Sequence, residues 1–197
     1  MLDAAGGVIR DFSYNNKDPW PESPDNGGPS LVLLRPTTNP DHSLGANWRA
    51  SYAIGGAPGS GDALSYNTWA GTNGIGDLIG TGDNDGDGYF NLVEYALGMN
   101  PTQPSNAAKP VVATQALSVL GVVSNYLTIT ITRPIGRDDV SYAAEGSTNL
   151  STAWTPAILI APPTFNGNGT ETLTWRHANP KAANVQQFLH LRITRLP

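Results

Sequence analysis

The sequence predicts a mostly-β protein built from two small antiparallel β-sandwich units, joined by an acidic loop and a short helix. Gly contributes 22 and Pro 16 of the 197 residues, and only 14% of the residues are charged. This composition favours short strands and many turns over helices. In the C-terminal part, apolar and polar residues alternate with a period of two, which is the period of a half-buried strand. A chain of this length holds one large or two small domains.

Three regions follow one another along the chain, and we place them at residues 1–61, 62–110 and 111–197. The first is rich in turns, with strands expected at Val8–Tyr14 and Leu31–Leu34. The second begins with a short helix around Tyr66–Ala70. It is then interrupted by repeated glycines: Gly71, Gly74, Gly76, Gly80 and Gly82. A stiff linker to the third region is predicted from Pro101, Pro104 and Pro110.

The third region carries the clearest strand pattern. Its alternating apolar positions are Leu127, Ile129 and Ile131; Val140, Tyr142 and Ala144; Leu173 and Trp175; and Leu189, Leu191 and Ile193. Two shorter strands are expected at Ala116–Leu120 and Ile158–Ile160. Turn-forming residues separate these segments. Together they predict a small antiparallel β-sandwich with one apolar face on each sheet.

The acidic loop reads D-N-D-G-D-G-Y-F-N-L-V-E from Asp83 to Glu94. Carboxylates at positions one, three, five and twelve, with a glycine at position six, have the spacing of an EF-hand type calcium loop. Calcium takes several oxygen ligands, and position seven supplies its backbone carbonyl. The predicted ligands are Asp83, Asp85, Asp87, the carbonyl of Tyr89, Asn91 and Glu94. The alternative is an acidic Asp-Gly turn that holds no ion.

The residues around the loop indicate the kind of calcium site. Residues 92–97 fit one or two turns of helix, which Gly98 would end. No helix of normal length precedes the loop, and a sensor would need a paired loop and a Met-rich groove, whereas this chain has two Met residues. We therefore expect a structural ion. Phe90 is expected to point away from the ion and to fix the loop to the core.

Charge and cysteine content exclude several classes of function. A formal charge of −5 gives no electrostatic footprint for nucleic acid. Without cysteine there is no disulfide framework and no thiolate metal site. No apolar run is long enough to span a membrane, and residues 1–10 lack the features of a secretion signal. Because weak calcium sites belong outside cells, we expect part of a longer exported protein, although an intracellular chain remains an alternative.

Little in the sequence indicates catalysis, and we expect no enzyme. The histidines are far apart in the sequence: His42, His177 and His190. His190 is expected to point outward from its strand, as an ordinary surface histidine. Ser60 lacks the glycine two residues earlier that a nucleophile elbow needs. The pair Asp138 and Asp139 is interpreted as part of a hairpin turn.

Several segments resemble known families of exported bacterial proteins. Asn47–Tyr52, followed by Gly55–Gly59, is similar to the closing segment of lamin-tail domains, as are Phe12–Tyr14, Pro19–Pro21 and Gly28–Leu33. The lamin-tail domain is an immunoglobulin-like sandwich, so the resemblance implies an immunoglobulin-like first unit that lacks its first half. Asp83–Pro101 resembles the thrombospondin type 3 or dockerin-like calcium motif. The last region, with Tyr142–Leu150 and Trp154, resembles the β-sandwich that ends such proteins.

Three functions remain open. The first is a calcium-stabilised structural or adhesive module of a surface protein, in which the ion makes a rigid joint between the two sandwiches. The second is a self-assembling subunit of a fibre or surface layer, a possible homopolymer with Met1–Leu34 at the contact. The third is glycan binding by an exposed aromatic residue, for which Trp20 is the best candidate. The other tryptophans are Trp48, Trp69, Trp154 and Trp175, and Trp175 is expected in the core.

Overall fold

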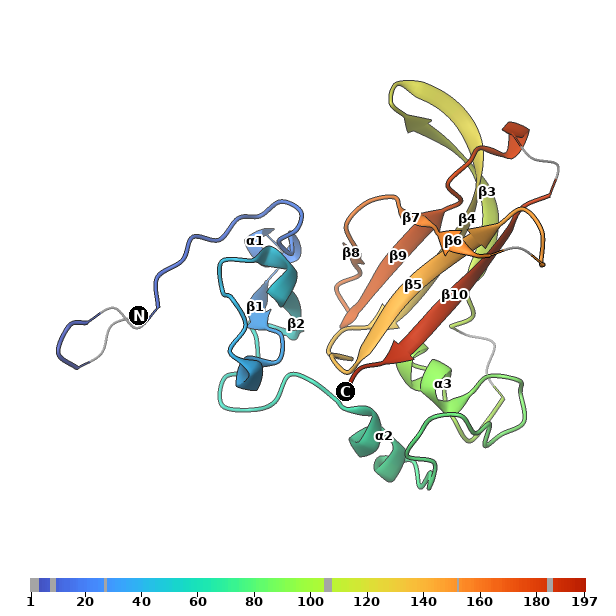
Figure 1. Ribbon diagram of the computed structural model, residues 1–197. Coiled ribbons are helices and arrows are strands. Elements are labelled where there is room, and N and C mark those ends of the chain that lie inside the picture. The colour runs from blue at the N-terminus through green and yellow to red at the C-terminus, as the bar shows by residue number, and fades with distance from the viewer. Residues whose placement is uncertain (1–3, 8–9, 27, 105–107, 152, 184–185) are drawn as a thin grey trace. The chain divides into compact units, whose positions relative to one another are not determined.

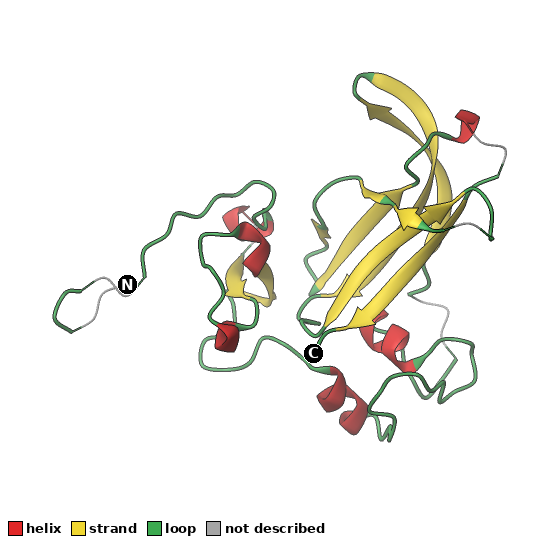
Figure 2. Ribbon diagram, viewed as in Figure 1, coloured by secondary structure: helices red, strands yellow, loops and turns green. Residues whose placement is uncertain are grey.

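The computed structural model describes residues 4–7, 10–26, 28–104, 108–151, 153–183 and 186–197 (Figure 1). The chain divides into two compact units, Met1–Asp62 and Ala63–Pro197. Strands make up 34% and helices 14% of the structure, which confirms the mostly-β prediction (Figure 2). No helix among the described residues has both the length and the apolar character needed to cross a membrane.

The first unit contains one two-stranded antiparallel sheet, formed by β1 (Pro29–Leu33) and β2 (Trp48–Ile54). Its short helical turns are α1 (Ser23–Asn26), η1 (Pro36–Thr38) and η2 (Gly45–Asn47). The strand predicted at Leu31–Leu34 is confirmed as β1. The strand predicted at Val8–Tyr14 is wrong for residues 10–14, which form no strand, and Val8 and Ile9 lie outside the described residues.

Aromatic rings form the packed centre of the first unit. Trp20 is only 8% exposed, and its ring lies 6.2 Å from Trp48 and 6.5 Å from Phe12. Phe12 also stacks on Trp48 at 5.3 Å. Offset stacking of this kind adds to the burial of a large apolar surface. Residues 10–14 therefore contribute a ring to this cluster without joining a sheet.

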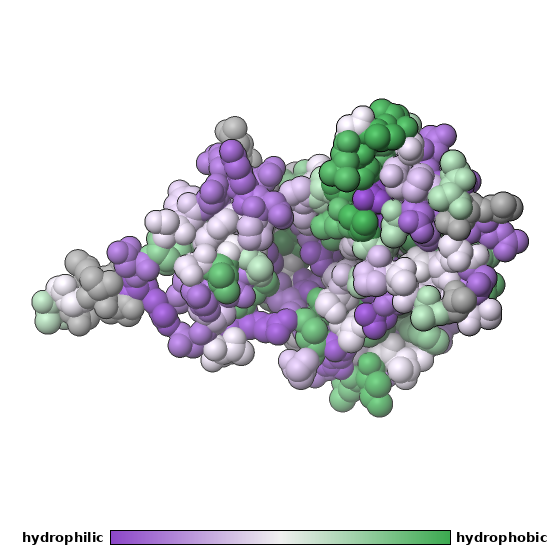
Figure 3. Space-filling view, turned by 45° about the horizontal axis from the view of Figure 1, so that its top comes forward, coloured by the Kyte–Doolittle hydropathy of each residue, from purple (hydrophilic) through white to green (hydrophobic). Residues whose placement is uncertain are grey.

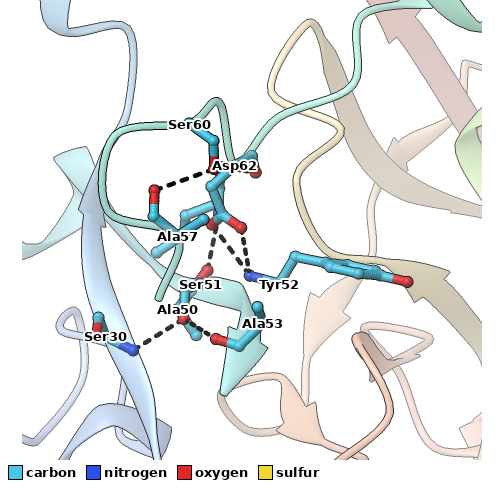
Figure 4. Close-up of polar contacts among 9 residues, drawn as sticks. Ser30, Ala50, Ser51, Tyr52, Ala53, Ala57, Ser60 and Asp62 are labelled. Carbon is cyan, nitrogen blue, oxygen red and sulfur yellow. Dashed lines mark hydrogen bonds and ion pairs between the residues drawn. The ribbon is translucent and has the colours of Figure 1, made fainter. Parts of the chain in front are cut away.

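Polar contacts of Asp62 join the end of the first unit to β2, and Figure 4 shows those with the backbone of Tyr52. The Asp62 carboxylate accepts from Arg49 Nη1 at 2.8 Å and from the backbone N–H of Tyr52 at 3.0 Å. Arg49 Nη2 also donates to the Asp62 carbonyl at 2.6 Å. On the other side of β2, Ser51 Oγ accepts from the backbone N–H of Ser30 at 2.8 Å, which connects the two strands. The chain from Gly55 to Asp62 is thereby closed into a loop beside the sheet.

The second unit begins with two short helices, α2 (Tyr66–Thr72) and α3 (Asn91–Leu97). Ser65 caps α2 by accepting from the backbone N–H of Thr68 at 3.3 Å. Gly98 ends α3 with a φ of 74°, a left-handed conformation that glycine adopts at little cost. Both predicted helices are confirmed, and no helix enters the acidic loop directly, because α2 ends at Thr72.

Among the described residues of the second unit, eight strands form two antiparallel sheets. They are β3 (Val111–Val119), β4 (Val122–Pro134), β5 (Val140–Ser147), β6 (Thr155–Pro156), β7 (Ile158–Leu159), β8 (Thr164–Phe165), β9 (Thr170–Arg176) and β10 (Phe188–Arg195). One sheet has the order β3-β4-β9-β7, with β8 also paired to β9, and the other has the order β10-β5-β6. The strands predicted in this region are all present, and β6 and β8 are additional.

Side chains from both sheets meet in one core, which α3 extends. Ile129 and Ile131 of β4, Leu173 and Trp175 of β9, and Ala144 of β5 are buried together with Leu97 of α3. A second core joins α2 to the other side of α3 through Tyr66, Trp69 and Tyr95. The Tyr95 hydroxyl donates to Asp139, whose carboxylate also accepts from the backbone N–H of Tyr66 at 2.7 Å. Asp139 is therefore a structural anchor for both helices as well as a turn residue.

Candidate metal site

The acidic loop is shaped by hydrogen bonds from its own backbone to its aspartates. Asp83 accepts from the N–H of Gly86 at 2.8 Å and from that of Gly88 at 2.9 Å. Asp85 and Asp87 each accept from the N–H two residues further on, at 3.1 and 2.9 Å. These bonds curl the loop around its carboxylates. Positive φ values at Gly86 (76°) and Gly88 (94°) allow the tight curvature.

The structure brings three of the predicted ligands together. Carboxylate oxygens of Asp83, Asp85 and Asp87 all lie within 4.8 Å of one another. Three like charges at this separation repel one another unless a cation neutralises them. One oxygen of Asp85, Oδ2, is buried and has no hydrogen-bond partner among the described residues.

Glu94 provides a second and independent indication of a cation. Its side chain is 0% exposed, and neither Oε1 nor Oε2 has a hydrogen-bond partner within the described protein. Burial, together with the charges of Asp85, Asp87 and Asp83, raises the pKa of Glu94 to about 7. A buried carboxylate without donors is costly. A bound divalent cation would remove that cost by supplying the missing partner.

Asn91 also presents a buried oxygen without a partner. Its side chain is 0% exposed and its Oδ1 has no hydrogen-bond donor within the described residues. Its amide nitrogen donates to Asp77 Oδ2 at 3.1 Å and to Asn84 Oδ1 at 3.3 Å. Because a carboxylate only accepts, the contact with Asp77 fixes which end of the amide is nitrogen. The oxygen of Asn91 is left available for the ion.

Asp77 is a site residue that the sequence did not reveal. Its carboxylate accepts from the backbone N–H of Ile79 at 3.0 Å, of Gly80 at 2.9 Å and of Gly82 at 2.6 Å. Burial alone would raise the pKa of Asp77, but these bonds and the one from Asn91 hold it below its usual value of 3.8. The segment before the loop is thereby folded into a compact turn.

That turn caps α3 in place of an N-terminal side-chain cap. The carbonyls of Gly80 and Gly82 accept from the backbone N–H groups of Leu92 at 3.1 Å and Asn91 at 2.7 Å. A Cβ at Gly80 would lie 2.7 Å from Leu92 Cβ, so a larger residue would not fit. The glycine-rich segment before the loop therefore fixes the start of α3, as an entering helix does in a helix-loop-helix calcium site. The pattern of an aspartate followed by glycines three and five residues later is the signal that could have identified Asp77.

One expectation about the loop is wrong. Phe90 is 57% exposed and does not fix the loop to the core. Its neighbours do this instead: Tyr89 packs against the core between the sheets and Leu92 against the core beneath α2. Phe90 lies at the N-cap position of α3, where its backbone extends away from the helix. Because Tyr89 and Leu92 fill the positions against the two cores, the side chain of Phe90 is left exposed to solvent.

The predicted ligands therefore occupy three kinds of position. Asp83, Asp85 and Asp87 form the close group, and Glu94 and Asn91 present buried oxygens without partners. The contribution of the Tyr89 carbonyl stays a prediction. Carboxylate and amide oxygens without nitrogen or sulfur ligands suit calcium better than zinc or copper. These residues fit a calcium ion, and its chemistry here would be charge neutralisation.

The other residues considered for function have structural roles. Trp20 was expected to be exposed and is instead buried, because it is enclosed by the rings of the first unit. His190 faces outward as expected: its Nε2 lies 2.8 Å from Glu145 Oε2, and its ring stacks on Trp154 at 4.1 Å. The Ser60 hydroxyl donates to the Ala57 carbonyl at 3.3 Å. Trp175 lies in the core as expected.

Comparison of the chain with known protein families, with curated proteins and with solved structures finds no match. The loop chemistry is therefore the basis for a functional assignment.

Proposed function

We propose that this chain is a non-enzymatic, calcium-stabilised structural or adhesive module of an extracellular surface protein. The observation that carries the proposal is Glu94, a fully buried carboxylate whose two oxygens have no partner in the described protein beside three clustered aspartates. Calcium would accept these oxygens as ligands and would neutralise the repulsion among the carboxylates. The resemblance to lamin-tail and dockerin-like segments fits the same proposal.

The ion would act inside the second unit. We expected a joint between the two units, but α3 packs into both cores of residues 63–197, so the loop belongs to that unit. An ion bound to Glu94 and Asn91 would stabilise the first turn of α3. Because Tyr95 and Leu97 of the same helix pack into the two cores, the ion would also stabilise the packing of both cores. An ion at a hundredfold excess over its Kd adds about 2.7 kcal/mol to the stability of the folded state.

An extracellular location follows from the kind of site proposed. A single loop with one exiting helix lacks the paired arrangement of a sensor, and isolated sites of this type have calcium affinities suited to the millimolar calcium outside cells. The exposed apolar residues of the chain and its remaining surfaces would then serve contacts with neighbouring domains. Glycan binding is not proposed, because its candidate residue, Trp20, is buried.

Titration calorimetry with calcium tests the proposal. The wild type is expected to bind one ion, and Asp83→Asn is expected to lose most of that binding. Asp41→Asn is a matched control, because Asp41 lies in the first unit and, like Asp83, accepts from a nearby backbone N–H, that of Ser43 at 2.9 Å. Absence of calcium binding by the wild type, or equal binding by Asp83→Asn, would show that the loop is an ion-free acidic turn.

A further inference from the structure

Strand β3 is an edge strand of the larger sheet. It pairs with β4 over residues Val111–Val119, and no other described strand pairs with its opposite side. In an antiparallel strand, alternate residues direct their N–H and C=O groups away from the neighbour. An edge strand therefore presents a row of free hydrogen-bonding groups that another extended strand can pair with.

Strand β3 lacks the sequence features that normally keep an edge strand from pairing with another chain. The strand contains no charged residue, no proline and no glycine, and residues 110–132 carry no charge at all. Val111 is 61% and Val112 is 56% exposed. The side chain of Lys181 reaches the strand, donating to Thr114 Oγ1 at 3.4 Å, but this contact uses a side chain and not the backbone of β3.

The β3–β4 hairpin also extends beyond the rest of its sheet. Strand β9 pairs with β4 only from Thr128 onward, and the carbonyl of Leu127 accepts from the N–H of His177, so residues 122–126 of β4 pair with β3 alone. Figure 1 shows this two-stranded ribbon projecting from the unit, and Figure 3 shows apolar surface over its end. Leu120 is 100%, Val122 64% and Val123 70% exposed. The half of β3 that projects in this ribbon, residues 115–119, therefore lies beyond the strands of the sheet other than β4.

We propose that β3 pairs antiparallel with β3 of a second copy of this chain. Two copies that each carry a net charge of −5 repel one another at long range, but residues 110–132 are uncharged, so pairing through them places no like charges in direct contact. A partner of opposite charge would instead be attracted to charged residues, which this segment lacks. The occupant that fits an uncharged, extended edge best is the same edge of another copy.

The sequence of β3 is complementary to itself in one register. With Gln115 opposite Gln115, Val111 faces Val119 and Ala113 faces Leu117, so apolar side chains meet on one face. The two Gln115 amides can each donate and accept across the symmetry axis. At about 3.4 Å per residue, nine residues give a contact about 30 Å long. The joined sheet would run without interruption through both copies.

This contact predicts a closed dimer and not a fibre. Antiparallel pairing of identical strands is two-fold symmetric, and a two-fold contact uses each edge once and is then complete. The expectation from the sequence was assembly through Met1–Leu34. The present proposal places the contact at β3, whose strand, unlike β1 (Pro29–Leu33), contains no proline. A polymer would need a further, different contact.

Analytical ultracentrifugation over a range of protein concentrations tests the pairing. The wild type is expected to form a dimer, and Ala116→Lys, which places a charge on the exposed edge, is expected to stay monomeric and to melt like the wild type at concentrations where the wild type is also monomeric. Thr132→Lys is the control, since it adds the same charge to an exposed position of β4. A wild type that is monomeric throughout, or an Ala116→Lys variant that dimerises equally, would overturn the proposal.

Single cysteines test the register, because the chain has no cysteine of its own. Directly opposed residues in an antiparallel pair have Cα atoms about 4.5–5.5 Å apart, within the range of a disulfide. Gln115→Cys is expected to give a cross-linked dimer on mild oxidation, whereas Ser118→Cys, which would face Val112, is not. Equal cross-linking of both variants would refute this register. Asp83→Asn keeps all of β3 and should dimerise normally, so a failure of calcium binding is distinguishable from a failure of pairing.

Discussion

Replacing Glu94 by glutamine is expected to change stability in opposite directions with and without calcium. In the folded protein without calcium, burial and the charges of Asp85, Asp87 and Asp83 raise the pKa of Glu94 to about 7 from its ordinary 4.5. Above pH 7 the folded state therefore holds an unfavourable buried charge. Glutamine has the same shape without that charge, and its amide can donate to the neighbouring carboxylates.

The magnitude follows from the two pKa values. The difference between 4.5 and about 7, at about 1.4 kcal/mol per pKa unit, corresponds to about 3 kcal/mol. Because the folded-state pKa is the higher one, the calcium-free protein loses this stability as pH rises from 4.5 through about 7. At about pH 8 in chelator, Glu94→Gln should be more stable than the wild type by up to about 3 kcal/mol, or roughly 10 °C in melting temperature.

Calcium reverses the order. The wild type gains about 2.7 kcal/mol at a hundredfold excess of calcium over Kd, whereas Glu94→Gln has lost a carboxylate ligand and gains little. Thermal melts of both proteins at about pH 8, in millimolar calcium and in excess chelator, measure all four values. The expected result is that the two melting curves exchange order between the two conditions.

Glu171→Gln is the matched control for this experiment. Glu171 lies on β9 and pairs with Arg133, whose Nη2 is 2.6 Å from Glu171 Oε1. Loss of this partly exposed pair should cost about 1 kcal/mol or less, with the same sign in calcium and in chelator. If Glu94→Gln behaves like this control, lowering stability equally in both conditions, then Glu94 is an ordinary structural carboxylate and the reasoning about the ion is wrong.

Three further substitutions test the packing of the structure, each by urea unfolding. Trp175→Ala should cost about 3–5 kcal/mol, because Trp175 is only 6% exposed in the core between the sheets; a cost below about 1 kcal/mol would contradict that core. Gly98→Ala should cost more than about 1 kcal/mol, because φ is 74° and the new Cβ would lie 2.8 Å from Pro134 Cγ. Phe90→Ser should change the free energy of unfolding by less than about 0.5 kcal/mol, since Phe90 is 57% exposed. A larger loss of stability would show that Phe90 packs in the core after all.

The strands of the third region were predictable because their signal is local. Ile129 and Ile131, or Leu173 and Trp175, repeat every second residue, and each pair is buried between the sheets as its period requires. The two-residue strands β6 and β8 are too short for any period. They are strands because the fold places Thr155–Pro156 beside β5 and Thr164–Phe165 beside β9. The local sequence does not determine these neighbours.

The metal site was predictable only in part for the same reason. The ligand spacing from Asp83 to Glu94 is a property of twelve consecutive residues, and the structure brings its three aspartates together. Asp77 lies outside that pattern, and its role depends on the fold of Gly80 and Gly82 around it. The exposure of Phe90 and the burial of Trp20 likewise depend on which neighbours occupy the core. Residue type alone did not determine either outcome.

Asp77 and Glu94 together explain how the loop can be ordered by the protein and still require an ion. The backbone N–H groups of Ile79, Gly80 and Gly82 already satisfy Asp77, which keeps the pKa of Asp77 low and fixes the turn before the loop. Glu94 has no such donors, and burial together with the charges of Asp85, Asp87 and Asp83 raises its pKa. Below about pH 7, calcium must displace a proton from Glu94 to bind through it, so binding and proton release are coupled. The ion would therefore supply the missing partner for the buried oxygens that the chain leaves unsatisfied at this site, which belong to Asp85, Asn91 and Glu94.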